Sequence, residues 1–348
     1  MKILADYSLD NLKELMVSLG EKPFRAGQIF RNIHNGKGIT EMTDISKALK
    51  EKLLSEFCDN PIQIIKELVS KDGTKKYLFK LYDGNVIEGV LMNYKYGNTL
   101  CVSTQVGCRM GCTFCASTLG GLVRNLSSGE ILSEILAVNR HIGGDINKRQ
   151  ITNVVLMGSG EPLDNYDNVV NFLRLLSCPD GINISPRNVS LSTCGLVPKM
   201  IALADEGLPV NLTLSLHSPF DEERKKIMPI ANSYKVSEII GALDNYFEKT
   251  GRRYYLEYSL IHGVNDTELC AKELQRLFKS KPCHINLIRL NSVKEKSLIA
   301  TTDKKADEFM KKLEKLGLSV TLRRRMGDDI DGACGQLRRR YIEGDSDN

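Results

Sequence analysis

Three cysteines lie close together in the sequence and point to metal chemistry. Cys108, Cys112 and Cys115 follow a C-x3-C-x2-C spacing, so one short loop supplies three thiolates. A four-iron, four-sulfur cluster has four corner irons, and a cluster that only passes electrons is normally held by four cysteines. Three thiolates would leave one iron free to bind a small molecule. A zinc site is the alternative, but zinc prefers four tetrahedral ligands, often from paired C-x2-C knuckles. No second knuckle occurs in the sequence.

This spacing, with the aromatic Phe114 just before the third cysteine, resembles the signature of the radical SAM superfamily. In that superfamily the open iron binds S-adenosylmethionine (SAM) through its amino and carboxylate groups. Reduction of the bound sulfonium gives a 5′-deoxyadenosyl radical, so the cofactors supply the difficult chemistry. The resemblance implies a 4Fe–4S cluster with three cysteine ligands, and SAM.

Composition is ordinary for a globular protein, with 348 residues, 42% hydrophobic and 26% charged. The longest apolar runs are too short for a membrane span, and the N-terminus lacks the features of a secretory signal. Ten cysteines without an export signal favour a reducing compartment. We therefore expect a cytoplasmic protein with no membrane partner.

Basic residues gather at both ends of the chain, although the net charge is only +5. Arginine triplets at 323–325 and 338–340 flank Cys334, and further basic residues stand at Lys22, Arg25, Arg31, Lys37, Lys47, Lys50 and Lys52. Such clusters can follow a phosphate backbone. They can equally be solvated faces, so charge alone leaves RNA binding open.

The pattern of the sequence divides the chain into four segments. Residues 1–60 indicate a small helical domain, and residues 61–97 a β-hairpin extension around the turn Asp83-Gly84. Residues 98–325 alternate short apolar strands with amphipathic helices, which predicts parallel βα units. Residues 326–348 form a loop and a basic tail.

Seven strands and six helices are expected in the third segment. We place the strands near 100–104, 153–157, 189–192, 211–216, 254–260, 285–290 and 319–323, and the helices near 128–141, 166–177, 197–206, 236–250, 266–280 and 303–316. Periodicity alone cannot separate a partial barrel from an open doubly wound sheet. The radical SAM resemblance favours an α/β fold with a partial (βα)6 TIM-like barrel.

Polar motifs follow several of these strands directly. Ligand groups gather at the C-terminal ends of strands in parallel βα folds. Gly160 and Glu161 follow the second strand, where glycine permits close approach and a carboxylate can pair with the SAM ammonium. A plain glycine turn is the alternative. Later strands end at Ser192, at Ser215-Leu216-His217 and at Asn291. His217 can instead be a structural histidine, and Asn291 only a turn residue.

Three further residues are candidates for chemistry. Cys334 lies in a loop rich in glycine and aspartate, where a core position is not expected, so it is a candidate reactive thiol. Cys101 lies on the first strand, and a buried apolar thiol is its default interpretation. Glu88 stands among apolar neighbours, either on the polar face of a strand or as a tuned base.

Together these motifs resemble the RlmN family over roughly residues 20–341. The similar segments are 101–108, 115–121, 215–217, 286–288 and 327–337. Members of this family methylate C2 of adenosine in 23S rRNA, at the peptidyl-transferase centre, and in tRNA, 3′ of the anticodon. Arg289 and Ser218 depart from the usual proline and alanine and are similar to the sister Cfr-type enzymes, which methylate C8 and confer antibiotic resistance. Segments 104–106 and 117–121 favour C2.

The resemblance also implies roles for individual residues. Cys108, Cys112 and Cys115 would hold the cluster, and SAM would contact Gly160, Glu161, Ser192, Ser215, Leu216, His217 and Asn291. Two SAM molecules are used per turnover. The first methylates Cys334, and the radical from the second removes hydrogen from that methyl, whose carbon then adds to C2. Glu88 accepts a proton, and Cys101 releases the product by forming a disulfide with Cys334.

Partners follow from the same resemblance. The N-terminal domain would bind 23S rRNA or tRNA, with the target base extruded toward Cys334. A flavodoxin or ferredoxin would donate electrons, and we expect a monomer. Two other functions stay open: a radical SAM enzyme for a small molecule would not need Cys334, and an iron–sulfur sensor or RNA-binding module would not cleave SAM.

Overall fold

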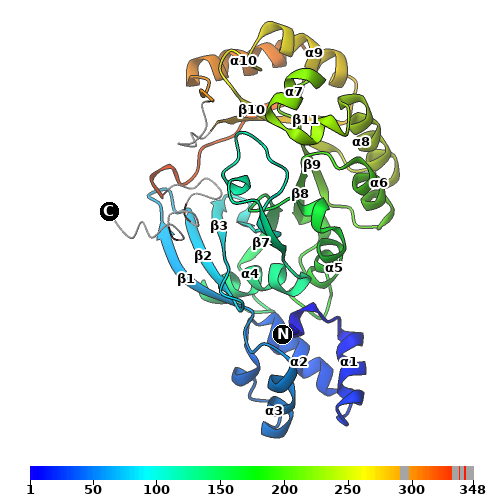
Figure 1. Ribbon diagram of the computed structural model, residues 1–348. Coiled ribbons are helices and arrows are strands. Elements are labelled where there is room, and N and C mark those ends of the chain that lie inside the picture. The colour runs from blue at the N-terminus through cyan, green and yellow to red at the C-terminus, as the bar shows by residue number, and fades with distance from the viewer. Residues whose placement is uncertain (291–297, 331–336, 338–340, 342–348) are drawn as a thin grey trace.

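The computed structural model describes residues 1–290, 298–330, 337 and 341. The chain begins with a group of short helices: η1 Leu4–Asp6, α1 Leu9–Ser18, α2 Arg25–His34, η2 Ile39–Glu41 and α3 Lys47–Glu56. Serine side chains begin two of them, because Ser8 and Ser46 accept hydrogen bonds from the backbone amides of Asn11 and Leu49. These helices lie below the main body of the molecule (Figure 1).

A single ten-stranded sheet forms the main body, in the order β1-β2-β3-β4-β7-β8-β9-β10-β11-β12. The first four strands are antiparallel, and all strands from β4 onward run parallel. Their bounds are β1 Ile62–Val69, β2 Lys75–Leu81, β3 Val86–Tyr94, β4 Gly97–Cys101, β7 Ile151–Leu156, β8 Val189–Thr193, β9 Asn211–Ser215, β10 Tyr254–Leu260, β11 Cys283–Arg289 and β12 Val320–Leu322.

The α/β partial barrel predicted from the sequence is confirmed, because β1 and β12 are opposite edges of one open, curved sheet (Figure 1). The strands predicted beside the Asp83-Gly84 turn are β2 and β3. Together with β1, they form an antiparallel addition to the barrel sheet. The strand β1 was not predicted as a separate element. The barrel and this addition therefore share one continuous inner face.

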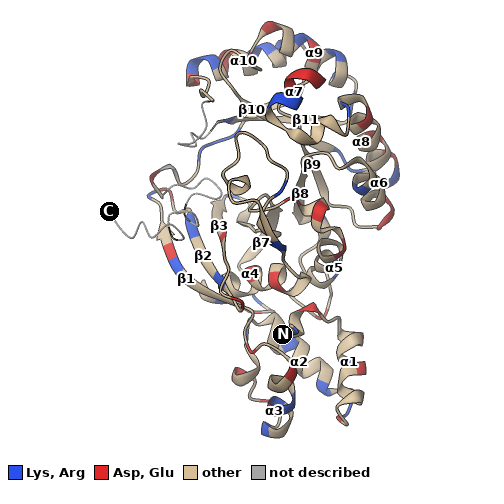
Figure 2. Ribbon diagram, in the orientation of Figure 1, with Lys and Arg blue, Asp and Glu red and all other residues tan. Residues whose placement is uncertain are grey.

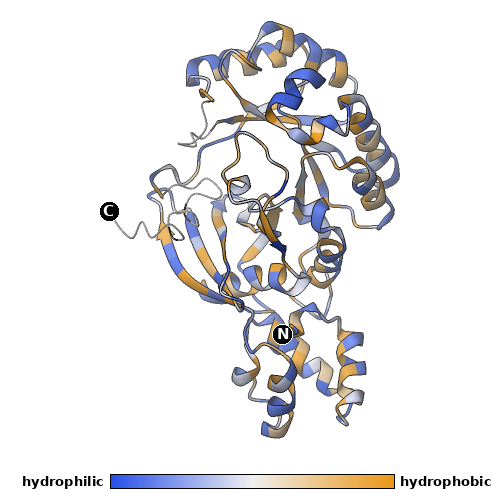
Figure 3. Cartoon of the chain, viewed as in Figure 1, coloured by the Kyte–Doolittle hydropathy of each residue, from blue (hydrophilic) through white to orange (hydrophobic). Residues whose placement is uncertain are grey.

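Helices cover the outer face of the parallel strands (Figure 1). They are α4 Ser128–His141, α5 Tyr166–Leu176, α6 Val197–Asp205, α8 Val236–Thr250, α9 Glu268–Phe278 and α10 Asp303–Lys315. Hydrophobic residues gather on the strands and on the sheet-facing sides of these helices (Figure 3), and charged residues lie mainly on the outside (Figure 2). In the described parts of the chain, none of the helices could span a bilayer.

Smaller elements frame the cysteine loop. The strands β5 Gln105–Gly107 and β6 Leu122–Asn125 form an antiparallel pair around it, and η3 Ala116–Thr118 lies within it. The remaining short elements are η4 Pro162–Asn165, η5 Pro186–Asn188, α7 Asp221–Ile227, η6 Pro229–Asn232 and η7 Asp328–Ile330. Sequence periodicity did not predict α7, which has only seven residues, six of them charged.

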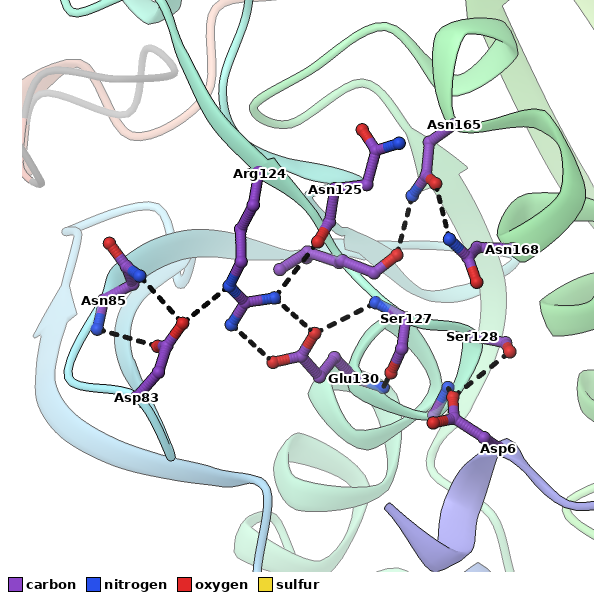
Figure 4. Close-up of polar contacts among 12 residues, drawn as sticks. Asp6, Asp83, Asn85, Arg124, Asn125, Ser127, Ser128, Glu130, Asn165 and Asn168 are labelled. Atoms are coloured by element: carbon purple, nitrogen blue, oxygen red, sulfur yellow. Dashed lines mark hydrogen bonds and ion pairs between the residues drawn. The ribbon is translucent and has the colours of Figure 1, made fainter. Parts of the chain in front are cut away.

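Arg124 on β6 ties this hairpin to the rest of the fold (Figure 4). Its guanidinium binds both oxygens of Glu130 at 2.7 and 2.8 Å, and its Nε lies 2.6 Å from Asp83 Oδ2 in the β2–β3 turn. Bidentate pairs of this kind fix geometry as well as adding energy. Glu130 in turn completes the capping box of α4 with Ser127. The base of the cysteine loop is therefore fixed to both β2–β3 and α4.

Candidate active site

The cysteine loop is held by backbone contacts from both of its sides. The amide of Cys108 donates to the carbonyl of Gly121 at 2.9 Å, and the amide of Thr113 donates to the carbonyl of Ile227 at 2.9 Å. Gly107 has a φ of 82°, and a Cβ there would lie 2.0 Å from the Gly121 oxygen, so only glycine fits. The loop is thus fixed between β6 and the end of α7.

The three thiols form a donor set that suits an iron–sulfur cluster. Cys108 and Cys112 are buried, and Cys115 is partly buried. Burial raises the pKa of Cys108 to about 12 and also raises that of Cys112, and the neighbouring Cys115 adds to both effects. Iron cations would offset the cost of ionising these thiols.

No three Cys, His, Asp or Glu side chains in the described residues could hold one common metal ion. The ligands of a four-iron cluster each bind a different iron, so they need not converge on one point. The residues present therefore fit the cluster.

Gly160 and Glu161 lie next to this loop, immediately after β7. Gly160 has a φ of 109°, and a Cβ there would lie 2.6 Å from the Cβ of Gln105. The buried Glu161 carboxylate accepts hydrogen bonds from the amides of Cys194 at 2.8 Å and Leu163 at 3.1 Å, and burial raises its pKa. These donors fix the orientation of the carboxylate, the type of group that an ammonium binds in a charge-assisted hydrogen bond.

The ends of β8 and β9 bring two further predicted residues together. The hydroxyl oxygens of Ser192 and Ser215 lie 3.3 Å apart. Parallel pairing of these strands places both side chains at the same end of the sheet. The two hydroxyls therefore form one polar site close to Cys194, whose amide donates to Glu161.

His217 follows Leu216 in a strained backbone conformation, with a φ of 55°. Its Nδ1 accepts a hydrogen bond from the Ser259 amide at 3.0 Å, and its ring meets Phe114 edge-on at 4.6 Å between centroids. Burial lowers its pKa to about 3, so the ring is neutral, with its proton on Nε2. The contact with Phe114 joins the end of β9 to the cysteine loop.

Glu88 and Cys101 lie on one face of neighbouring strands. Val90 on β3 pairs directly with Cys101 on β4, and Glu88 stands two residues before Val90, so all three side chains share a face. Glu88 is buried, and the Nζ of Lys76 lies 3.3 Å from its carboxylate. Lys76 could not be recognised from the sequence, because a lysine on a strand usually faces solvent.

The C-terminal segment contacts these same strands. Cys334 and Asn291 lie outside the described residues. Before that gap, the Gly327 amide donates to Asp72 at 3.0 Å, and the Lys71 amide donates to Asp329 at 3.1 Å. After it, Leu337 packs against Leu78 and Val86, and Leu78 pairs directly with Glu88. Described residues on both sides of 331–336 therefore contact the β1–β3 region.

Comparison with known proteins shows the family of the chain. The radical SAM superfamily model matches residues 102–271, and the model of the N-terminal domain of ribosomal RNA large subunit methyltransferases matches residues 3–58. The probable dual-specificity RNA methyltransferase RlmN of Lachnoclostridium phytofermentans is 52% identical over 97% of this chain and 94% of its own. That of Clostridium perfringens strain 13 is 54% identical over 99% of this chain and 98% of its own. The chain belongs to the RlmN family of radical SAM RNA methyltransferases.

A crystal structure of a radical SAM methyltransferase from Sphaerobacter thermophilus also matches, with a TM-score of 0.90 and 38% identity over 97% of this chain and 99% of that one. Membership of the RlmN family confirms the predicted fold and enzyme class, and it implies a 4Fe–4S cluster and SAM as cofactors. The two substitutions at Arg289 and Ser218 therefore do not place the chain with the Cfr-type enzymes.

Proposed function

We propose that this enzyme methylates C2 of adenosine in 23S rRNA, at the peptidyl-transferase centre, and in tRNA, 3′ of the anticodon. Family membership supports the reaction class. The observation that carries the proposal is the shared face of β3 and β4, where Glu88 and Cys101 lie together. The anchoring of Gly327, Asp329 and Leu337 to the neighbouring strands supports a role there for the loop that contains Cys334.

In this proposal three thiolates hold the cluster, and the ends of the parallel strands hold SAM. The cluster ligands are Cys108, Cys112 and Cys115, and the SAM contacts are Gly160, Glu161, Ser192, Ser215, Leu216, His217 and Asn291. When bound, the cluster and SAM supply a 5′-deoxyadenosyl radical. Two SAM molecules are used per turnover, because one provides the methyl group and the other the radical.

The chain's own residues carry the methyl group and release the product. The Cys334 thiolate takes a methyl group from a sulfonium, so a sulfur–carbon bond forms as another breaks. Once that carbon is bonded to C2 of the base, Glu88 accepts the C2 proton and the adduct gives up one electron, which a bound cluster could accept. The Cys101 thiolate then attacks the Cys334 sulfur, forming a disulfide. The electron pair of the broken carbon–sulfur bond stays on the new methyl carbon, which takes up a proton.

We assign the four segments as follows: residues 1–60 bind RNA, 61–97 form a strand extension, 98–325 form the barrel, and 326–348 carry Cys334. Basic residues on α2 and α3 support the first assignment (Figure 2). A flavodoxin or ferredoxin would supply electrons to a monomeric enzyme in the cytoplasm, where ribosomes and tRNA are available.

Mass spectrometry of the modified nucleoside tests the proposal. Reconstituted enzyme is incubated without oxygen with reductant, SAM and protein-free 23S rRNA, beside Cys334→Ala as a control that should make no methylated base. We expect 2-methyladenosine. A product of 8-methyladenosine would contradict the assigned position, and release of deoxyadenosine without any methylated base would contradict the substrate.

A further inference from the structure

Arg224 on α7 is the largest completely buried side chain among the described residues, with an exposed fraction of 0%. Its Nε donates to the Leu216 carbonyl at 3.1 Å, and its Nη2 donates to the carbonyls of Cys194 at 2.6 Å and Ser215 at 3.2 Å. Nη1 is buried and has no hydrogen-bond partner within the described structure. The side chain thus spans the ends of β8 and β9.

A buried guanidinium is costly unless an anion compensates its charge. Among the described residues its hydrogen-bond partners are three neutral carbonyl groups and no carboxylate. The groups that act on its charge are the thiols of Cys194 and Cys112 and, to a smaller extent, the Asp221 carboxylate. Arg224 binds the carbonyl of Cys194, which packs in one apolar cluster with Cys112 of the cysteine loop. Within the described part of the chain, the site therefore contains a buried cation to which no carboxylate is hydrogen-bonded.

Helix α7 also supports the cysteine loop directly. The Thr113 amide donates to the Ile227 carbonyl, three residues after Arg224, and Cys112 belongs to one apolar cluster with Cys194, Ile227 and Met228. Helix α7 thus contacts both the loop that carries Cys112 and the strand ends at Ser215 and Leu216. The Arg224 guanidinium binds the strand-end part of the site.

We propose that Arg224 is a positioning residue whose fixed positive charge compensates the iron–sulfur cluster and favours its reduced form. A 4Fe–4S core of charge 2+ with three thiolates has a net charge of −1, and one-electron reduction by an external donor changes it to −2. A nearby buried cation stabilises the more negative state. This inference rests on the proposed ligation by Cys108, Cys112 and Cys115.

The midpoint potential of the cluster tests the inference, with EPR-monitored titration by dithionite in the reconstituted full-length enzyme. Two unit charges about 10 Å apart shift an equilibrium roughly tenfold at an effective dielectric of about 20. We expect Arg224→Met to lower the ratio of reduced to oxidised cluster about tenfold at a fixed potential, a shift of about 59 mV for a one-electron couple. Arg224→Lys, which keeps the charge, should stay within about twofold of the parent.

Lys226→Met is the matched control, because it removes the same charge from an exposed position on the same helix. It should leave the potential unchanged. An unshifted Arg224→Met variant, or an equal shift in Lys226→Met or Arg224→Lys, would overturn the inference. If Arg224→Met does not hold a cluster, the Arg224→Lys variant tests the inference instead. A cluster content and midpoint potential equal to those of the parent would support the role of charge. Loss of the cluster in Arg224→Lys would contradict it. A parent protein that binds no such cluster would overturn the proposed function itself.

Discussion

Lys76 and Glu88 form a buried ion pair at the centre of the proposed site. Their side chains have exposed fractions of only 0% and 6%. Removing one partner of a buried pair leaves an uncompensated charge, which costs about 3–5 kcal/mol. We predict that Lys76→Met lowers the free energy of unfolding by about this amount, measured by denaturant titration.

The double variant Lys76→Met/Glu88→Leu is the control for this effect. It removes both charges and replaces them with apolar atoms, so most of the lost stability should return. Methyl transfer should not return, because the proposed proton acceptor is absent. A single variant as stable as the parent would contradict a buried, interacting pair.

Individual charged residues were the least predictable part of the site. The cysteine spacing predicted the cluster ligands, because they are neighbours in sequence. Lys76 and Arg224 were missed, since their burial depends on strands and loops that are distant in sequence. The run Asp221–Lys226 has the composition of a solvated face, yet the fold buries its fourth residue completely.

His34 on α2 joins the N-terminal helices to the barrel. Its Nδ1 accepts a hydrogen bond from the Ile182 amide at 3.1 Å, and burial lowers its pKa from 6.5 to about 4. Below pH 6.5 the unfolded chain binds a proton that the folded chain excludes, so stability is lost as the pH falls toward 4. We predict a loss of about 2 kcal/mol from this group between pH 7 and pH 5, measured by denaturant titration.

Between pH 7 and pH 5, the His34→Gln variant should lose about 2 kcal/mol less unfolding free energy than the parent. His262→Gln is the matched control, because the His262 side chain is exposed. Its pH dependence should equal that of the parent. An unchanged pH dependence in His34→Gln would mean that His34 has the same pKa in the folded and unfolded chains.

Asp72, in the turn between β1 and β2, anchors the start of the C-terminal segment. It accepts a hydrogen bond from the Gly327 amide at 3.0 Å. Although some desolvation opposes the effect, amide donors from Thr74 and Gly327 lower its pKa to about 2. We predict that Asp72→Ala speeds amide exchange at residues 327–330 and lowers methyl transfer about fivefold, with SAM cleavage retained.

Lys71→Ala is the control in the same turn, because Lys71 contributes its backbone amide to Asp329. Hydrogen exchange and turnover should both match the parent. Parental exchange rates in Asp72→Ala would show that this contact does not anchor the segment.

Secondary structure elements were predictable where burial and periodicity agree. The strand expected at 254–260 is β10, Tyr254–Leu260, whose residues are mostly buried. The first barrel strand was predicted near 100–104, but it is β4, Gly97–Cys101. The prediction began too late because the sequence Tyr96-Gly97-Asn98 is typical of a turn. The β-hairpin extension was predicted, but its continuity with the barrel depends on β3–β4 pairing that no local pattern encodes.

At the scale of the whole molecule, the helices α2 and α3, which carry basic residues, lie at one end, below the sheet (Figure 2). If α2 and α3 bind RNA, Arg31→Ala/Lys47→Ala should weaken binding and reduce the slope of log affinity against log salt by about 0.7 for each lost phosphate contact. Lys272→Ala, an exposed change on α9, is the control. An unchanged slope in the double variant would place the RNA surface elsewhere.

Analysis of the covalent intermediate tests the central claim most directly. Cys101→Ala enzyme is incubated anaerobically with reductant, SAM and 23S rRNA, and the protein–RNA adduct is digested with nuclease and protease for mass spectrometry. Without the resolving thiol, we expect an adenosine joined through one methylene carbon to Cys334. Normal release of 2-methyladenosine by this variant, or an adduct on any other residue, would contradict the account.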